Sequence, residues 1–302
     1  MTAYWFEVPS AIVLRVTGRD SLRYLNARLT NDIRSLEVGN GCLAAALTPK
    51  GKVEGLFSVH KFGNEDFFLY CDGGDRAAVV SAFKRYIVAD RVAVNDESET
   101  TSLFHLIDGF ALLTQLSIPV LDHPFSHAQA GQITAVRRSR TPAIGYDFFV
   151  PRTRRSEIIS LITHAAKELS VEEQRKLRIR AGQPMYGSEI SDANNFSELQ
   201  LKDAISYSKG CYTGQEVMEK IDSRGKAPRL MKRVVTRGTV HTLPGDIIAS
   251  IDASGKQTPM GEIVSSSIDV EMNQTIAFAL LRNKPLDIGE KLLVRGVDLL
   301  EM

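Results

Sequence analysis

The residues best suited to chemistry lie in one octapeptide, KGCYTGQE, from Lys209 to Glu216. It places a thiol, Cys211, between Gly210 and Gly214 among polar or amphipathic side chains, whereas a cysteine that only fills a core lies among apolar residues. The two glycines indicate a turn whose backbone angles other residues avoid. Lys209 favours the thiolate, the form that acts as a nucleophile or metal ligand. We predict that Cys211 is reactive; a structural, partly buried cysteine is the alternative.

The neighbours of Cys211 have a binding interpretation and a structural one. Lys209 can balance a carboxylate, and Tyr212 can stack on a flat heterocycle. Gln215 and Glu216 can hydrogen-bond the polar edges of such a ligand, or they begin a helix and complement its N-terminal dipole. One thiol cannot hold a zinc ion or an iron–sulfur cluster, because such sites need three or four protein ligands. We therefore expect no metal site in this chain.

The octapeptide resembles the motif of the YgfZ/GcvT-type folate-binding family, which is related to the T-protein of glycine cleavage. Four other blocks are similar to motifs of this family, occur in the family's order and spread over most of the chain: VTGRDSLRYLNARLTNDI (16–33), LTPKGKV (47–53), RIRAGQPMYGSEI (178–190) and SRGKAPRLMKRVV (223–235). The octapeptide is the most specific of the five. Proteins with this octapeptide form the YgfZ branch of the family.

The resemblance implies an α+β fold with two interleaved ferredoxin-like domains and a C-terminal β-barrel around a central cavity. Residues 1–45 with 138–225 would form the first α+β domain, residues 46–137 the second, and residues 226–302 the barrel. The cavity would hold tetrahydrofolate or a one-carbon derivative, with Cys211 at its mouth, so that bound folate protects the thiol. The ligand contacts are expected at Lys209, Gly210, Tyr212, Gly214, Gln215, Glu216, Asp72, Arg180, Arg224 and Arg229.

Three positions depart from the T-protein pattern. T-proteins carry a catalytic aspartate after the first hairpin glycine, where this chain offers only Glu54 in GKVEGLF. Their pteridine-binding glutamate corresponds to Arg180, and the asparagine after the next strand corresponds to Asp72. A carboxylate beside folate would orient or protonate the reacting nitrogen. These departures weaken the case for aminomethyl transfer and favour the YgfZ branch.

The YgfZ resemblance implies a tetrahydrofolate-binding accessory protein of iron–sulfur cluster assembly or repair that uses Cys211. Its partners would be cluster assembly proteins or client enzymes, including enzymes that modify tRNA. One alternative is a folate-dependent aminomethyltransferase of the T-protein type. Another is a non-catalytic scaffold for which folate is a structural or sensory ligand. Whether the chain is an enzyme, as a one-carbon transferase would be, is open at this point.

Bulk composition agrees with an ordinary globular protein: 302 residues, 43% hydrophobic and 24% charged. A net charge of +1 excludes a strongly basic nucleic-acid binder, so we expect no direct nucleic-acid binding. Three separated cysteines without a CxxC pair indicate a reducing compartment. The N-terminus lacks a signal-peptide pattern, and the apolar run 109–121 is too short to span a bilayer. We expect a cytoplasmic protein without membrane contact.

Local patterns predict the elements that must position these residues. Strands are expected at 10–16, 42–47, 53–59 and 67–71, and a helix after Asp20 or Ser21. Asp75 is expected to cap a second helix, Ser156 to open a third that extends to Leu169, and Gly182 to end a fourth. Short strands after Arg229 predict a small barrel or sandwich, at 232–236, 246–250, 262–266, 275–281 and 291–295.

Two basic clusters and two histidines have ambiguous roles. Residues 137–155 and 220–237 are rich in arginine and lysine, which indicates either an anionic partner or a solvated face with neutralising acids elsewhere. We favour the second interpretation for 137–155 and leave both open for 220–237. His123 and His127 have helical spacing for metal ligands, but Pro124 argues against a helix, so we expect both in a loop.

Overall fold

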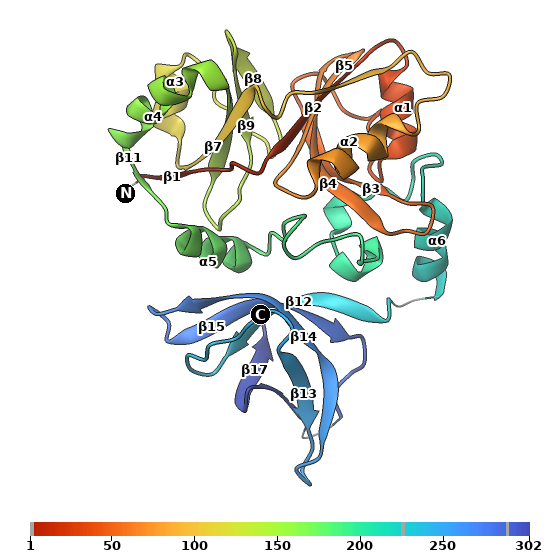
Figure 1. Ribbon diagram of the computed structural model, residues 1–302, viewed down its shortest axis with the longest axis vertical. Coiled ribbons are helices and arrows are strands. Elements are labelled where there is room, and N and C mark those ends of the chain that lie inside the picture. The colour runs from red at the N-terminus through yellow and green to blue at the C-terminus, as the bar shows by residue number, and fades with distance from the viewer. Residues whose placement is uncertain (1–2, 225–226, 288–289) are drawn as a thin grey trace.

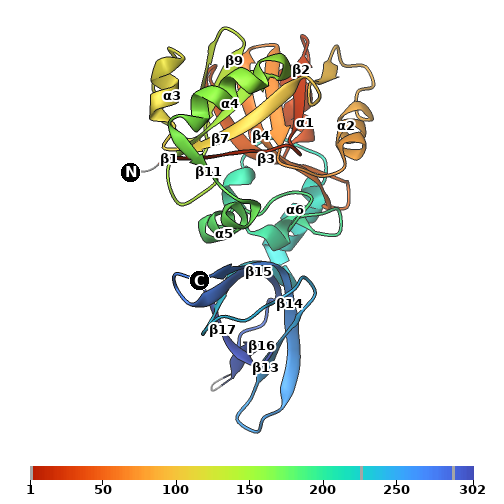
Figure 2. The ribbon, with the colours of Figure 1, turned by 60° about the vertical axis from the view of Figure 1, so that its left-hand side comes forward.

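A computed structural model describes residues 3–224, 227–287 and 290–302, without the side chains of residues 222 and 224. Two sheets with their helices form the upper half of the molecule, and a β-barrel lies below them (Figure 1). Helix α5 (Val171–Ala181) and the segment after it lie between the two halves (Figure 2). This is the predicted α+β class with a C-terminal barrel, in which helices and sheets pack as layers around shared cores.

The first sheet is built from strands between residues 12 and 96. Within the described residues it has five strands in the order β3-β4-β5-β2-β6, namely Gly41–Leu47, Val53–Gly63, Asp66–Cys71, Ile12–Thr17 and Ala93–Asp96. Helices α1 (Ser21–Arg28) and α2 (Arg76–Lys84) cover its outer face. Their apolar side chains join one buried core with the sheet, and Leu14, Leu25, Leu29, Phe57 and Phe83 are among its fully buried members.

The second sheet joins the chain's first strand to segments that lie far along the sequence. Its order in the described part of the chain is β11-β1-β7-β10-β9-β8, namely Ala166–Glu168, Ala3–Glu7, Thr101–Ile107, Gly145–Pro151, Ile133–Arg137 and His127–Ala130. Helices α3 (Phe110–Gln115) and α4 (Arg155–Thr163, after the 3-10 turn η1, Arg152–Arg154) pack on its outer face. A separate apolar core, with Phe68, Tyr70, Val136 and Phe149, lies between the two sheets.

This pairing of strands differs from the predicted division of the chain. Residues 1–45 were expected to join 138–225, yet β2 and β3 pair within residues 12–96, and only β1 crosses to the second sheet. The parallel pairing of β1 with β11, in which Trp5 lies opposite Glu168, adds β11 to the second sheet as an edge strand. Such long-range pairing leaves no local sequence pattern, because each strand has the same alternation whichever strand it joins.

The barrel strands lie within the predicted segment 226–302. In the described residues a closed barrel has the order β12-β15-β14-β13-β16-β17, namely Arg229–Thr236, Gln274–Arg282, Gln257–Asp269, Ile247–Ile251, Lys291–Val294 and Val297–Glu301. The sequence had predicted strands near the first five of these positions. The last strand, β17, was missed; it follows a tight turn at Arg295 and Gly296, both with positive φ.

The helix boundaries show which local sequence signals were sufficient to predict where a helix starts or ends. Asp75 caps α2 as predicted, because its carboxylate accepts a hydrogen bond from Ala78 N at 3.1 Å. Gly182 ends α5 in the left-handed conformation at φ 68°, as expected. Asp20 does not cap α1 through its side chain, which instead accepts from Arg91 N at 2.8 Å. The helix expected from Ser156 to Leu169 is wrong beyond Thr163, because residues 166–168 form β11.

Candidate functional site

Cys211 is exposed, on the irregular segment before α6 (Gln215–Arg224). The 3-10 turns η2 (Phe196–Leu199) and η3 (Lys202–Ala204) precede this segment. Cys42 is largely buried, and Cys71 is buried with a pKa raised far above its usual range by burial. A thiol must be accessible to act as a nucleophile or ligand. Of the three cysteines, Cys211 is therefore the one that the fold presents to solvent.

Lys209 has a structural task that differs from the predicted one. Its ammonium donates to the backbone oxygens of Asn26, Leu29 and Asn31, each at 2.6 Å. These carbonyls belong to the C-terminal end of α1, where helical carbonyls lack partners within the helix. The same ammonium lies 5.2 Å from the centre of the Tyr212 ring. Lys209 thus ties the motif to α1 instead of pointing its charge at a ligand.

The charge of Lys209 acts on a different thiol from the one expected. Burial raises the pKa of Cys42 to about 12, and Lys209 opposes that rise. Burial in turn lowers the pKa of Lys209 to about 8. The prediction that Lys209 activates Cys211 is therefore not supported by the geometry: three carbonyls hold the ammonium, and Cys42 is the cysteine that it influences.

The rest of the octapeptide also builds structure around the thiol. Tyr212 is buried in the core beneath β3 and the barrel, so its ring is not available for stacking on a ligand in this conformation. Gln215 begins α6: its Oε1 accepts from Tyr212 N at 3.2 Å, and its Nε2 donates to Glu219 at 2.6 Å. Glu216 is exposed in the first helical turn, where an acid complements the dipole. Gln215 and Glu216 thus begin a helix, as their structural interpretation describes, and their ligand contacts stay a prediction.

Only one of the two glycines is required by the backbone. Gly214 has φ 88°, and a Cβ there would lie 2.7 Å from the carbonyl oxygen of Thr48. That contact seats the start of α6 against the turn between β3 and β4. Gly210 has no other atoms within 4 Å of an added Cβ and is not among the described residues with positive φ.

A cavity of about 760 Å³ lies away from this motif. Its lining comes from the β1–β2 connection, Arg140, the start of α5 and residues 185–188: Phe6, Glu7, Val8, Pro9, Ser10, Arg140, Glu168, Leu169, Ser170, Val171, Gln174, Arg175, Arg178, Met185 and Ser188. None of residues 209–216, all of them described, belongs to this lining. Cys211 thus does not line this cavity, which differs from the expectation that the thiol lies at the mouth of the folate cavity.

The capping of α5 places its first turns against the cavity. Ser170 accepts from Glu173 N at 3.3 Å while the Glu173 carboxylate accepts from Ser170 N at 2.8 Å, which is a capping box. Along the helix, Gln174 and Arg178 point to the same side because residues four apart share a face. Arg180 lies on the other side and pairs with Asp269 of β14.

Most charges at the cavity are neutralised by neighbouring side chains. Arg178 makes a two-pronged pair with buried Glu189 at 2.5 and 2.8 Å. Glu7 is paired in the same way with Arg155, at 2.9 and 2.6 Å. Arg175 lies 3.3 Å from Glu172, which is exposed. The cavity is thus polar but carries little unbalanced charge.

A buried network of charges joins the two sheets beside the cavity. Arg140 binds both oxygens of Asp147 at 2.8 and 2.9 Å and lies 2.7 Å from Asp72. His105 and Tyr70 also bind Asp147, each at 2.8 Å. Burial alone would raise the pKa of Asp147, but Arg140 and His105 outweigh it and hold that pKa far below its usual range.

Asp72 belongs to this network. Its carboxylate lies 3.3 Å from Arg138 as well as near Arg140, and these charges lower its pKa despite burial. The expected ligand contact at Asp72 is thus a bridge between the sheets, because Asp72 follows β5 whereas both arginines lie between β9 and β10.

The other predicted ligand contacts are engaged in ion pairs or lie outside the described part. Arg180 joins α5 to the barrel through Asp269, which is fully buried. Arg229, at the start of β12, lies 3.1 Å from buried Glu198. Glu54 lies between Arg28 and Arg85 and pairs with both. The side chain of Arg224 is not described. Arg180 and Arg229 thus connect segments that lie far apart in the sequence.

The basic clusters largely follow the structural interpretation. In the cluster 137–155, Arg138 and Arg140 pair with Asp72, and Arg154 pairs with Glu157 at 2.5 Å. In the cluster 220–237, Lys232 lies 3.2 Å from Glu301, and Arg233 donates to the carbonyl of Arg180 at 2.6 Å. Asp72 and Glu301 come from distant segments, so the sequence could not place them beside these cations, whereas Glu157 is only three residues from Arg154.

His127 is not in a loop: it begins β8, is buried, and stacks on Phe62 with ring centres 4.2 Å apart. Among the described residues no group of three or more histidine, cysteine, aspartate or glutamate side chains is arranged to hold a metal ion. In the same part of the chain, no helix is both long and apolar enough to cross a membrane.

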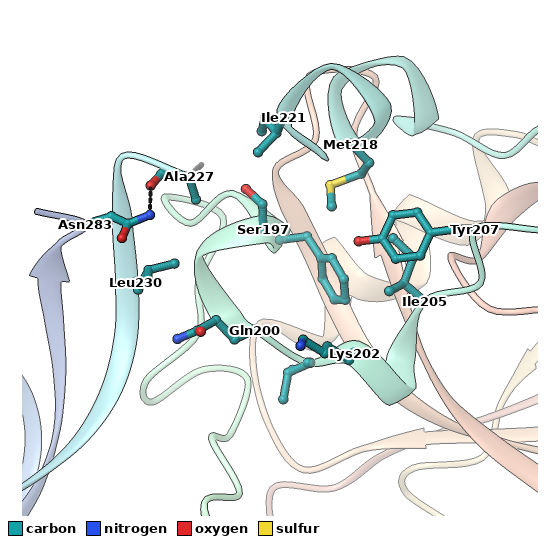
Figure 3. Close-up of a pocket in the computed structure, with 12 residues that line it drawn as sticks. Ser197, Gln200, Lys202, Ile205, Tyr207, Met218, Ile221, Ala227, Leu230 and Asn283 are labelled. Carbon is teal, nitrogen blue, oxygen red and sulfur yellow. Dashed lines mark hydrogen bonds between the residues drawn. The ribbon is translucent and has the colours of Figure 1, made fainter. Parts of the chain in front are cut away.

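A smaller pocket of about 230 Å³ lies between α6, η2 and the start of β12 (Figure 3). Its lining is mostly apolar and includes Phe196, Ile205, Met218, Ile221 and Leu230. Asn283 donates to the carbonyl of Ala227 at 2.9 Å at the barrel side of the pocket. No residue of 209–216 lines this pocket, and α6 contributes Met218 and Ile221 to it.

The sequence pointed to few of the cavity residues. Arg140 lay in a basic cluster and Arg178 in the RIRAG block, but Ser10, Glu168 and Gln174 carried no motif. The pattern Ser170-x-x-Glu173 is a helix-start signal that could have located the end of the cavity formed by α5. The pairing of β1 with β11 brings Glu168 next to the β1–β2 connection, which no local pattern indicates.

The complete fold is that of a T-protein. The structure aligns with that of the glycine cleavage system aminomethyltransferase T from Bartonella henselae at a TM-score of 0.86, with 15% identity, covering 99% of this chain and 84% of that one. The model of the family described as GCVT N-terminal domain matches residues 2–209. The chain therefore belongs to this family, which confirms the predicted YgfZ/GcvT-type assignment and its fold class.

Curated relatives carry two different names. An aminomethyltransferase of Koribacter versatilis (strain Ellin345) is 25% identical over 291 residues, covering 91% of this chain and 75% of the relative. A tRNA-modifying protein YgfZ of Serratia proteamaculans (strain 568) is 26% identical over 298 residues, covering 94% and 85%. The family match ends at Lys209, so it includes only the first residue of the octapeptide.

Proposed function

We propose that this chain is a tetrahydrofolate-binding accessory protein of the YgfZ type that serves iron–sulfur cluster assembly or repair. The observation that carries the proposal is the separation of two features: a folate-sized cavity in the α+β half, and an exposed thiol on a rigid support elsewhere. The folate-binding part rests on the family, and the use of Cys211 rests on its exposure. Cluster enzymes, including those that modify tRNA, would be its clients.

The cavity suits a folate in size and lining. Small-molecule sites have volumes of about 300–1,000 Å³ and combine apolar walls with a few polar groups. Here the apolar part is formed by Phe6, Val8 and Leu169, and the polar part by Ser170 and Gln174, among others. Bound folate would supply a one-carbon carrier. The chain's own residues would hold its ring between apolar side chains and exclude water.

Cys211 would act on a partner protein rather than on the folate. Its thiol is exposed, whereas Lys209, Tyr212 and Gly214 hold the segment against α1 and the turn at Thr48. A single accessible thiol can ligate an iron transiently or exchange with a disulfide on another protein. A stable cluster needs further ligands, which the client would contribute.

Aminomethyl transfer is less well supported. Glu54, the nearest acid to the position of the T-protein aspartate, is neutralised by Arg28 and Arg85. Arg180 replaces the pteridine-binding glutamate and faces the barrel. A transferase would need a group that exchanges a proton with the reacting nitrogen. We expect no formation of methylenetetrahydrofolate from an aminomethyl donor under conditions where folate binds.

The test is complementation of a strain that lacks this gene. Wild type, Cys211→Ser and Cys42→Ser would be compared by the activity of iron–sulfur enzymes, and the purified proteins by tetrahydrofolate titration. We expect micromolar binding for all three, a dissociation constant on the order of 1 μM, with rescue by wild type and Cys42→Ser but not by Cys211→Ser. Full rescue by Cys211→Ser would contradict the use of the thiol and favour a non-catalytic scaffold.

A further inference from the structure

One charged group that lines the cavity, Glu168, forms no ion pair with a described residue, and Arg155, which pairs with Glu7, acts on it only from beyond ion-pair distance. Five ionisable residues line it: Glu7, Arg140, Glu168, Arg175 and Arg178. Four of them have ion-pair partners, namely Arg155, Asp147 with Asp72, Glu172 and Glu189. Glu168 forms no ion pair or side-chain hydrogen bond with any residue that the structure describes. A carboxylate that the fold leaves unpaired at a ligand cavity is available to a donor on the ligand.

Long-range structure fixes the position of Glu168. It ends β11, pairs in register with Trp5 of β1, and precedes Ser170, the N-cap of α5, by two residues. Phe6 and Leu169, which also line the cavity, are buried in the core between the sheets. An exposed carboxylate thus lies beside an apolar wall, and both belong to elements with extensive backbone pairing.

We infer, on the basis of the folate site proposed above, that Glu168 recognises the pterin ring of the bound folate. One edge of a pterin presents two adjacent donors, the ring N3–H and the 2-amino group. A carboxylate offers two acceptor oxygens at matching separation, and such two-pronged, charge-assisted bonds are strong and directional. The ring faces would rest on the apolar wall, as flat ligands do in such cavities.

The other acids near the α+β half do not fit this role. Glu7 lines the cavity, but both of its oxygens are bound by Arg155. Glu189 is fully buried beneath Arg178, and Glu54 is held by two arginines. Recruiting any of them would leave an arginine unpaired, which is costly when the cation is buried. Glu168 can accept the ligand without breaking an existing pair.

The experiment combines a protein change with a ligand change. Wild type, Glu168→Gln and Glu168→Asp would be titrated calorimetrically with tetrahydrofolate and with its 2-desamino analogue, which lacks one of the two donors. We expect wild type to prefer tetrahydrofolate by about tenfold or more, since a charge-assisted hydrogen bond is lost with the analogue. In Glu168→Gln this preference should fall to about threefold or less, because a neutral amide has one acceptor oxygen.

Two controls separate recognition from folding. Glu157→Gln removes a surface carboxylate that pairs with Arg154, and should change neither affinity by more than about twofold. Glu168→Asp keeps the charge and should retain part of the preference. Because Glu168 is exposed, the midpoint of thermal unfolding should not change in either Glu168 variant.

The outcomes separate the role of Glu168 from the folate site itself. Retention of the full preference by Glu168→Gln, with tetrahydrofolate still bound by wild type, would overturn the role of Glu168 and leave the proposed function intact. An equal loss for both ligands would also overturn it, because that pattern indicates a change of cavity shape rather than loss of one donor contact. If wild type bound neither ligand, the folate site itself would be wrong.

Discussion

The cavity region and the Cys211 motif place their functional groups in opposite ways. At the cavity, two arginines are held by buried carboxylates, Arg140 by Asp147 and Arg178 by Glu189. At the motif, the neighbours of the thiol are committed to backbone contacts, while the thiol itself is exposed. The first region thus forms a cavity, and the second presents one sulfur atom to solvent.

The difference changes how the family motif should be interpreted. A motif residue can be essential because it touches a ligand or because it supports one that does. Lys209 and Gly214 fall into the second group, since the first binds the end of α1 and the second allows close contact with Thr48. Positioning residues of this kind are as important to a site as those that touch the substrate.

The buried network should show the largest effect. Asp147→Asn removes the charge that balances Arg140 while keeping the size of the side chain. Removing one partner of a buried pair destabilises by about 3–5 kcal/mol, because the other charge stays buried. Urea unfolding monitored by circular dichroism would measure it. Glu157→Gln, at an exposed pair, should lose less than about 1 kcal/mol; equal losses would contradict the contrast between buried and exposed pairs.

The pH dependence of the free energy of unfolding should show that the folded protein lowers the pKa of His127. Burial, and secondarily Arg15, lower its pKa to about 4, so the folded state holds it neutral where the unfolded chain would protonate. The unfolded state therefore binds more protons than the folded state as pH falls from 6.5 to 4. The free energy of unfolding should decrease by about 3 kcal/mol over that window. His127→Phe should remove this part of the slope. An unchanged slope would show that His127 can be protonated in the folded protein.

The two glycines of the motif form a matched pair. Gly214→Ala requires an L-residue at φ 88° and brings its Cβ to 2.7 Å from a carbonyl, so we expect a loss of about 2 kcal/mol or more in the free energy of unfolding. Gly210→Ala meets no atom and should change it by less than about 0.5 kcal/mol. Similar losses at both positions would mean that the motif turns at Gly210 as well.

The smallest effect concerns Lys209. Lys209→Met removes three hydrogen bonds at the end of α1 and should destabilise by about 1–2 kcal/mol. The alkylation rate of Cys211 by iodoacetamide should nevertheless stay within about twofold of wild type, because three backbone carbonyls hold the ammonium. A rate that falls by about tenfold would restore the role that the sequence indicated for Lys209.

Local features of the fold could be predicted from the sequence, and long-range ones could not. The cap at Asp75 and the end of α5 at Gly182 depend on neighbouring residues, and both were found. The third helix was extended too far because the pairing of β11 with β1 joins residues more than 160 positions apart and overrides helical spacing.

The candidate site divides in the same way. Cys211 was identified from a contiguous motif, and its exposure agrees with a reactive role. The partners of Asp72 and Arg180 were not, because Arg140 and Asp269 are 68 and 89 residues away along the chain. Glu168 had no motif at all, and only the assembled structure shows that it lines the cavity without an ion pair to any described residue.

Alkylation of Cys211 with and without bound folate tests most directly whether cavity and thiol are separate. Mass spectrometry would follow carbamidomethylation of Cys211 in wild type, in the absence and presence of saturating tetrahydrofolate. Because no residue of 209–216 lines the cavity, we predict equal rates, within about twofold. Protection by about tenfold or more, lost in a variant that no longer binds folate, would place the thiol beside the ligand and contradict this account.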